Sequence, residues 1–351
     1  MAYSDPAYMS ADRAGTLAGG ITINNAYVQA YKEGFEQAFQ QTESKLQPFF
    51  EQESQNEEFQ YFDRIGVAED MTEDVSRYAD NPNSEISHDR RRIGLKDYEL
   101  GKYVDEKDLK RVLTDPMNSY TQALLASGKR KIDDIIISKF FGEAYVGKSG
   151  GTTRTFAEGV GDENRTNIVV GTKSAGDITA AGKYVIAGGE TEGFSIGSNY
   201  VDSGSSAESG LTLAKLRAAR TTMLRLQAIE QDEVVNCFVS AKQIDDLLGI
   251  TEVVNSDYAV RKSLVDGNVT SFLGFRFIQT ERLPLSTGSD GNERRCIVAT
   301  PKALKLSIGT ALKGDVWRVP AKKNIPYVYF KLCAEASRMW GEVAGEIRCA
   351  E

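Results

Sequence analysis

Residues Gly142 to Ser149 read GEAYVGKS and match the phosphate-binding pattern G-x-x-x-x-G-K-[ST] letter for letter. Such a loop binds phosphate because a strand delivers it and a helix follows, so that backbone N–H groups and the helix N-terminus face the oxygens. Here a long predicted helix precedes the motif, and Gly150-Gly151 after it is a poor helix start. No later strand ends in an acidic residue that would hold Mg²⁺. The order of elements favours a Gly-rich exit from a helix, with a P-loop nucleotide-binding protein kept as an alternative.

The cysteines and the one histidine do not form a catalytic or metal-binding pattern. Cys237, Cys296, Cys333 and Cys349 lack C-x-x-C spacing, and three of the four lie in apolar runs, so we interpret them as small buried hydrophobic residues. His88 stands among polar residues, and a chain with one histidine is a poor candidate for zinc or triad chemistry. We therefore expect no metal.

The paired carboxylates do not suggest acid–base catalysis. Asp133-Asp134 and Asp245-Asp246 are adjacent in sequence, so the two side chains of each pair point to different faces of a helix. No nucleophile elbow, dinucleotide fingerprint or ligand cluster occurs elsewhere. We expect a protein that is not an enzyme and needs no cofactor.

Composition narrows the class of protein further. The chain has 351 residues, a net charge of −8 and no strongly basic patch, which argues against a protein that binds nucleic acid tightly. No apolar run approaches the roughly 20 residues of a membrane span. The opening MAYSDPAYMS lacks the basic-then-apolar order of a secretory signal, so we expect a cytosolic site of synthesis and no membrane partner.

The N-terminal segment predicts a polar arm followed by one amphipathic helix. Aromatic residues recur at helical spacing after Asn24 and Asn25, and the pattern continues to Leu46, before Pro48. The flanking sequence offers no domain for this stripe to pack into, so we expect it to contact another subunit. The candidate contact residues are Tyr27, Tyr31, Phe35 and Phe39.

A highly charged stretch from about 57 to 110 follows, with short alternating pieces that indicate a long two-stranded excursion. Arg90, Arg91 and Arg92 stand together within it. They form either a solvated face or a charge complement for an acidic neighbour. We take all three as candidate intersubunit contacts.

The middle of the chain predicts a long helix followed by a Gly-rich β segment. Asp115 as cap and Pro116 in the first turn open a helix that runs to about Ala144, with Gly128 as a possible bend. Residues 145–210 are rich in Gly, Thr and Ser, with short β-like runs such as Asn167 to Val170.

The last third predicts a compact α/β domain. Thr212 caps a helix, and two strand–cap–helix units follow. The first unit is Val234 to Val239, with Ser240 and Gln243 as a capping box and a stop at Gly249. The second is Cys296 to Ala299, with Thr300-Pro301 opening a short helix that stops near Gly309. Two long strands, Pro326 to Cys333 and Met339 to Ile347, close the chain.

The order of these parts resembles the Hong Kong 97-type capsid fold of tailed-phage capsid proteins and encapsulins. The most similar local sequence runs from Val269 through Gly274 to Leu283-Pro284, a core–Gly–apolar strand–Leu-Pro passage. The resemblance implies an α+β fold with an N-terminal arm, an extended E-loop, a long spine helix in a peripheral domain, and an α/β axial domain. The expected segments are 1–56 for the arm, 57–110 for the E-loop, 111–210 for the peripheral domain, 211–325 for the axial domain, and 326–351 for C-terminal strands that return to the peripheral domain. The longer Gly-rich segment departs from the simplest members.

The resemblance also implies a function. We expect a major capsid protein that assembles from pentamers and hexamers into an icosahedral head around double-stranded DNA, contacted nonspecifically. Scaffolding, portal and decoration proteins are expected partners, and the virion, assembled in the host cytoplasm, is the expected location. An encapsulin-like nanocompartment shell is the other alternative.

Overall fold

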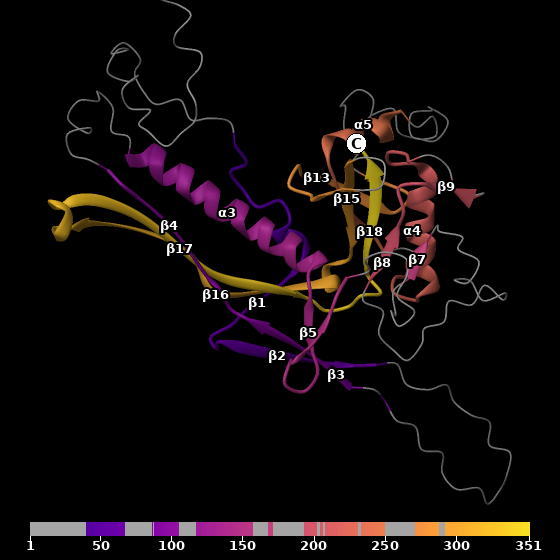
Figure 1. The fold of residues 1–351 in the computed structure, drawn as a ribbon, viewed down its shortest axis with the longest axis horizontal. Coiled ribbons are helices and arrows are strands. Elements are labelled where there is room, and N and C mark those ends of the chain that lie inside the picture. Colours follow the sequence, from indigo (N-terminus) through magenta and orange to yellow (C-terminus); the bar gives the residue numbers. More distant parts are fainter. Residues whose placement is uncertain are drawn as a thin grey trace, which may run out of the picture.

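The computed structural model describes residues 40–66, 86, 88–104, 117–156, 168–170, 193–201, 204–205, 208–230, 233–249, 271–287 and 292–351. In this part of the chain the fold is mixed α+β, with a long arm at one end and a compact sheet-and-helix region at the other (Figure 1).

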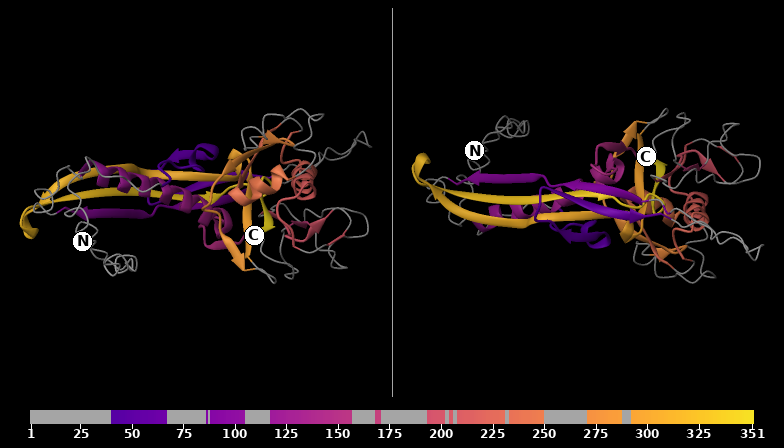
Figure 2. Two further views of the ribbon diagram at one scale, coloured as in Figure 1. Left: turned by 90° about the horizontal axis from the view of Figure 1, so that it is seen from above. Right: turned by 90° about the horizontal axis from the view of Figure 1, so that it is seen from below.

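The arm is a β-ribbon with a helix along it. Strands β16 (Leu304–Val319) and β17 (Ile325–Arg338) pair antiparallel, and the 16 residues of β16 extend roughly 50 Å at about 3.4 Å per residue. Strand β4 (Asp97–Tyr103) pairs with β17, and β1 (Glu51–Ser54), after the 3₁₀ turn η2 (Gln47–Phe49), pairs parallel with the start of β16. Helix α3 (Met117–Phe141) lies along this sheet, and the views from above and below show how narrow the arm is (Figure 2).

Helix α3 packs through the apolar stripe that the sequence predicted. Ile132, Ile135, Ile136 and Phe140 are buried at helical spacing. Gly128 faces β16, because a Cβ there would lie 2.6 Å from the Leu312 side chain. The close approach of helix and strand therefore explains this glycine.

A second sheet of four strands has the order β2-β3-β5-β6. It consists of β2 (Phe59–Ile65), β3 (His88–Gly94), β5 (Ala144–Val146) and β6 (Thr152–Arg154). Strands β2 and β3 pair antiparallel over their full length, as the charged excursion predicted.

The compact region is built on the largest sheet, of order β12-β13-β11-β15-β18-β8-β7, with β14 also paired to β15. Helices α4 (Leu213–Arg225) and α5 (Ala241–Leu248) pack on it. The strands are β7 (Ile168–Val170), β8 (Phe194–Ile196), β11 (Val235–Val239), β12 (Ser271–Phe272), β13 (Phe275–Gln279), β14 (Leu285–Thr287), β15 (Asn292–Ala299) and β18 (Ala344–Ala350). A separate pair joins β9 (Tyr200–Val201) and β10 (Gly204–Ser205), and 3₁₀ turns lie at η4 (Pro301–Ala303) and η5 (Pro320–Lys322).

Several local predictions are confirmed. The Thr212 side chain accepts a hydrogen bond from the Lys215 N–H and caps α4. Ser240 and Gln243 form the capping box of α5, and that helix stops at Gly249. The Gly274 turn, with φ +76°, joins β12 to β13 in the passage that carried the family resemblance.

Other predictions are wrong in their bounds. The N-terminal helix does not reach Leu46, because residues 40–46 are not helical; its earlier part, with Tyr27, Tyr31, Phe35 and Phe39, lies outside the described residues, as do Asp115 and Pro116. Helix α3 ends at Phe141 because the chain turns into β5 by Ala144.

The C-terminal bounds differ too. The turn after Thr300 is three residues long, and β16 begins at Leu304 and runs through Gly309, since Leu304 and Leu306 alternate inward with strand periodicity. Strand β17 continues to Arg338, and β18 begins at Ala344. Thus β17 lies in the arm sheet and β18 in the sheet of the compact region.

Candidate assembly interface

The GEAYVGKS segment forms a β-hairpin. Residues 147–150 make the turn between β5 and β6, with φ +87° at Gly147 and +64° at Gly150. The Gly150 N–H donates to the Gly147 carbonyl at 3.0 Å, and a Cβ on Gly150 would lie 2.7 Å from the Arg92 side chain. The glycines are thus explained by a tight turn beneath an arginine, and a strand follows where a P-loop needs a helix.

The hairpin gives a direct prediction. Lys148→Ala is expected to leave the thermal midpoint unchanged, with and without ATP and Mg²⁺, because the lysine lies on a turn with no helix N-terminus behind it. Gly150→Ala is expected to lower stability by about 1–2 kcal/mol, since alanine is strained at positive φ and meets Arg92. Differential scanning fluorimetry measures both. A midpoint raised by ATP in the wild type and not in Lys148→Ala would contradict the assignment.

The three arginines of β3 do not share one face. Arg91 is fully buried, with its Nε 3.5 Å from an Asp89 carboxylate oxygen. Arg90 points outward and donates to Asp63 at 2.5 Å, and this hydrogen bond lowers the pKa of Asp63. Arg92 is half-buried. Successive strand residues point to opposite faces, so the expectation of a continuous Arg90–Arg92 surface is corrected.

Outward-pointing side chains of this sheet form an aromatic and cationic surface, which we call the β2–β3 outer face. The Arg92 guanidinium lies over the Phe59 and Tyr145 rings, 5.0 Å from each centroid, and that of Arg90 lies 5.6 Å from the Tyr61 centroid. The exposed fractions of Phe59, Tyr61 and Ile65 are 43%, 42% and 60%. Clustered exposed apolar groups of this kind mark interaction surfaces.

A tether holds the end of the N-terminal segment on α3. The Asp133 carboxylate is fully buried and accepts four hydrogen bonds, from Gln41 Nε2 (2.6 Å), Ser44 Oγ (2.5 Å) and the Lys45 and Leu46 N–H groups (3.1 Å each). Sequence reasoning missed this role. The available signal was the placement of Asp133 three and four residues before Ile136 and Ile137, on the buried side of the helix.

We expect Asp133→Ala to release residues 41–46 from α3 and to lower the free energy of unfolding by about 2 kcal/mol, because the buried Leu46 N–H and the partly buried Lys45 N–H lose their acceptor. The matched control is Asp134→Ala, whose half-exposed carboxylate pairs with Arg282 at 2.6 Å; we expect it to cost no more than about 1 kcal/mol. Hydrogen exchange at the Lys45 and Leu46 amides reports the release. Unchanged protection there would disprove the tether.

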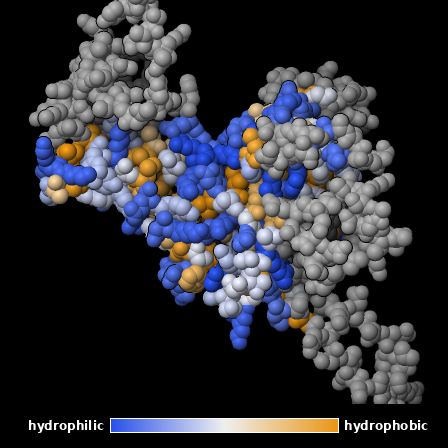
Figure 3. Space-filling view, viewed as in Figure 1, coloured by the Kyte–Doolittle hydropathy of each residue, from blue (hydrophilic) through white to orange (hydrophobic). Residues whose placement is uncertain are grey.

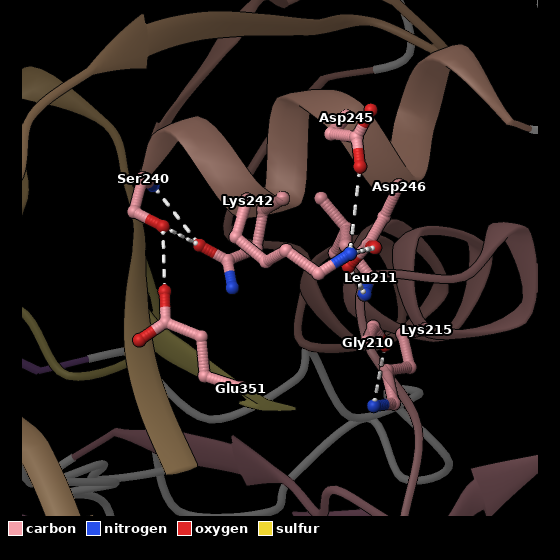
Figure 4. Close-up of polar contacts among 9 residues, drawn as sticks. Gly210, Leu211, Lys215, Ser240, Lys242, Asp245, Asp246 and Glu351 are labelled. Atoms are coloured by element: carbon pink, nitrogen blue, oxygen red, sulfur yellow. Dashed lines mark hydrogen bonds and ion pairs between the residues drawn. The ribbon is translucent and has the colours of Figure 1, made fainter. Parts of the chain in front are cut away.

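The end of the compact region beside α5 is tied together by polar contacts (Figure 4). The Leu211 N–H donates to Asp246 at 3.0 Å, and the Ser240 hydroxyl lies 2.9 Å from Glu351. Burial would raise the pKa of Glu351, but hydrogen bonds from Arg294 and Ser240 outweigh it and lower that pKa. Asp245 and Asp246 differ in their surroundings. Asp245 is exposed, whereas Asp246 accepts the hydrogen bond from the Leu211 N–H just before α4.

Lys215 is fully buried in α4, and burial lowers its pKa. Its Nζ donates to the carbonyls of Ser209, Gly210 and Arg348 at 2.6, 2.8 and 3.0 Å. These contacts join the loop before α4 to β18 and leave no open site for a nucleophile. Nearby, a surface depression of about 650 Å³ lies between residues 210–213 and the last turn of α5.

Within the described ranges, His, Cys, Asp and Glu side chains nowhere gather in groups of three that could hold a metal ion. Cys237, Cys296 and Cys349 are buried, as predicted, and Cys333 is partly buried. Among the helices of the same residues, none is long and apolar enough to cross a membrane.

Comparisons with known proteins agree on one class. A family model described as phage capsid protein matches residues 23–351. The fold is similar to the capsid structure of the cyanophage P-SCSP1u (TM-score 0.62, 12% identity, 92% of this chain and 93% of that chain). It is also similar to the capsid of cyanophage Pam1 (0.59, 14%, 92% and 97%) and to that of a native GTA particle (0.56, 12%, 97% and 98%). No curated protein sequence matches.

At identities this low the structural likeness shows the fold, which is that of Hong Kong 97-like capsid proteins. The family model spans nearly the whole chain. The protein therefore belongs to the phage capsid protein family and is a structural, non-enzymatic component of the virion shell.

Proposed function

We propose that this chain is the major subunit of an icosahedral phage head and assembles as pentamers and hexamers around a double-stranded DNA genome. The observation that carries this proposal is the arm, whose long strands and helix leave large apolar side chains exposed at sites remote from the main core. Such surfaces are stable in water when other copies cover them, and a contact between unlike surfaces of identical chains forms a ring when the rotation between neighbours closes on itself.

The parts have separate roles in this proposal. The compact region around β11, β15 and β18 is the axial domain and surrounds the five-fold and six-fold axes. The sheet beside α3 belongs to the peripheral domain, with α3 as its spine helix. The β2–β3 pair with the residues between them is the E-loop, which reaches over a neighbouring subunit. The segment before residue 57 is the N-terminal arm, which is distinct from the ribbon of β16 and β17, and Asp133 holds the end of it on α3 of the same chain.

Scaffolding, portal and decoration proteins are the proposed partners, with DNA contacted nonspecifically. The net charge of −8 supports weak DNA contact, because a basic inner wall would hold the genome against the movement that packaging requires. An encapsulin-like shell with the same fold would instead enclose an enzyme.

Negative-stain electron microscopy of the purified chain, expressed with its genomic neighbours, tests the proposal. We expect closed polyhedral shells or rings of capsomers. DNA inside supports the phage head, whereas an enclosed enzyme supports the encapsulin alternative. Monomers or dimers at all salt and protein concentrations would overturn the proposal.

The β2–β3 outer face gives a specific prediction. Changing both Arg90 and Arg92 to Ala is expected to reduce shell yield by at least about tenfold, while the thermal midpoint of the subunit shifts by only a few degrees, because both side chains lie on the outer side of the sheet. Arg91 is left unchanged, since its burial would confuse assembly with folding. Lys302→Ala, an exposed lysine outside this sheet, serves as control. Normal shell yield from the double variant would remove this face from the interface.

A further inference from the structure

Three buried thiols lie on neighbouring strands of the compact region. Cys237 is in β11, Cys296 in β15 and Cys349 in β18, and these strands follow one another in the order β11-β15-β18. All three side chains are 0% exposed and belong to the main apolar core. A buried cysteine usually serves as a small apolar residue, but two that lie close together can also be joined by a disulfide.

The strand register places Cys296 and Cys349 on one face of the sheet. Cys296 lies opposite Ile347, and Cys349, two positions further along β18, lies opposite Arg294. Because side chains alternate along a strand, residues two positions apart share a face, so the two cysteines are diagonal neighbours.

The contacts of Cys296 select Cys349 as its partner. The two thiols share a hydrogen bond, and this bond together with burial raises the pKa of Cys296. Cys237 lies opposite Val298 and is also diagonal to Cys296, but the hydrogen bond of Cys296 is made with Cys349. Two strand spacings, roughly 10 Å, separate Cys237 from Cys349, which exceeds the roughly 7 Å between Cα atoms that a disulfide can span.

The end of β18 offers a route by which an oxidant can reach this pair. β15 pairs along the whole of β18, whereas β8 pairs with residues 345–347, so among the described strands Cys349 has a paired neighbour on one side. A segment with fewer partners opens locally at a lower free energy than the whole fold. Here it is closed by contacts of Glu351 with Ser240 and Arg294 (Figure 4). The described surface over α5, beside Ser240, is hydrophilic (Figure 3).

We infer that Cys296 and Cys349 form a disulfide when the protein meets an oxidant of the organic disulfide class, such as oxidised glutathione. The Cys349 thiolate, exposed by opening of the segment, attacks the S–S bond of the oxidant and releases one thiol. The Cys296 thiolate then attacks the resulting mixed disulfide and releases the second thiol. Two cysteines lose two electrons and two protons, and the oxidant takes up both as it becomes two thiols.

The crosslink joins the two ends of the segment that forms the arm. Residues 297–348, between the two cysteines, contain all of β16 and β17. A crosslink across so long a segment removes conformations from the unfolded chain and so favours the folded state. Disulfides are rare in a reducing cytosol and persist outside cells. A subunit that folds with free thiols therefore gains this stabilisation after the virion leaves the cell.

Incubation of the full-length chain with oxidised glutathione tests the inference. The protein is then unfolded in N-ethylmaleimide, which blocks the remaining thiols, and digested with trypsin without reduction. We expect the peptide that begins at Cys296 to be joined to the one that begins at Cys349, since Arg295 and Arg348 precede them. A link between Cys237 and Cys296, or blocked Cys296 and Cys349 under conditions that fully oxidise dithiothreitol, would overturn the inference.

Thermal unfolding measures the consequence of the link. We expect oxidised glutathione to raise the thermal midpoint of the wild type by about 5 °C and dithiothreitol to reverse the gain. Cys349→Ala removes the gain, whereas Cys333→Ala, in strand β17 of the other sheet, retains it. A gain of the same size in Cys349→Ala would contradict the assignment of the crosslink to this pair.

The rate of crosslinking tests the route. Glu351→Gln weakens the ion pair with Arg294, whose Nη2 lies 2.7 Å from the carboxylate, so we expect the link to form at least about threefold faster than in the wild type. An unchanged rate would overturn the opening of this segment as the step that exposes Cys349. The reaction belongs to the single subunit, so its failure leaves the proposed shell assembly standing.

Discussion

Replacing Glu346 with glutamine is expected to lower the free energy of unfolding by about 3–5 kcal/mol, because it leaves the buried Arg295 and the partly buried Arg348 without this counter-charge. Glu346 of β18 is fully buried. Its carboxylate accepts from Arg295 Nε at 2.6 Å, from Arg348 Nε at 3.0 Å and from Ser195 Oγ at 2.6 Å. Glutamine keeps the volume and removes the charge, so the measured loss reports electrostatics and not a cavity.

This carboxylate matters beyond its own strand. It joins β15, β18 and β8, and the Arg295 guanidinium lies 4.0 Å from the centroid of Phe141, the last residue of α3. The network thus connects the compact region to the arm. Urea unfolding of dissociated subunits measures the loss. The control is Asp245→Asn, which breaks an exposed pair with Lys242 and is expected to cost under about 1 kcal/mol. A similarly small loss for Glu346→Gln would show that the arginines have other adequate partners.

Arg338→Met is the second large effect, with an expected loss of about 3–4 kcal/mol. Arg338 of β17 is 1% exposed, and its Nη1 donates to the carbonyls of Phe140 and Gly142 at 2.7 and 3.0 Å, while Nη2 donates to that of Arg154 at 3.2 Å. The carbonyls at the end of a helix have no partner within it and carry partial negative charge, so a cation there is stabilising. Methionine fills the space and leaves these acceptors without their donor.

Arg338→Lys is the informative companion variant. Lysine keeps the charge, but a single ammonium group cannot reproduce a fork aimed at three carbonyls, so we expect it to recover less than half of the loss. Denaturant unfolding gives both values, and hydrogen exchange in the last turn of α3 locates the effect. Full recovery by lysine would show that charge alone, without the fork, supports this helix end.

These two residues, with Asp133, fix the arm, the helix and the compact region relative to one another by buried, directional contacts. Apolar packing alone tolerates sliding, whereas a buried ion without its partner is costly, so such contacts favour one arrangement. A subunit that must repeat the same interfaces many times in a shell benefits from that rigidity.

The predicted E-loop, arm and domain boundaries, and the candidate contacts Tyr27, Tyr31, Phe35 and Phe39, stay predictions. For the candidate surface on β3, the structure changes how the test is made. The sequence grouped Arg90, Arg91 and Arg92 together. In the structure Arg90 and Arg92 point outward and Arg91 is buried, because side chains alternate along a strand.

The sequence by itself determined the features that depend on neighbours in the chain. The spacing of Ile132, Ile136 and Phe140 predicts a helix packed on one side, and Thr212 and Ser240 mark helix starts through bonds to residues three positions away. The order of a long helix followed by Gly147-Lys148-Ser149-Gly150-Gly151 was enough to argue against a phosphate site, because that chemistry needs a strand before and a helix after.

Only the tertiary structure decided the features that depend on distant partners. Asp133 and Asp134 are chemically identical neighbours, yet one is buried under residues 41–46 and the other pairs with Arg282, about 150 positions away in the chain. Arg338 and Glu346 are buried with partners that other elements bring, the end of α3 for Arg338 and strands β15 and β8 for Glu346. Strand β16 runs past Gly309 because β17 pairs along it, and strand length is set by pairing across the sheet more than by intrinsic propensity. Local sequence patterns specify helices and strands, whereas the burial of charged residues and the ends of strands depend on tertiary contacts.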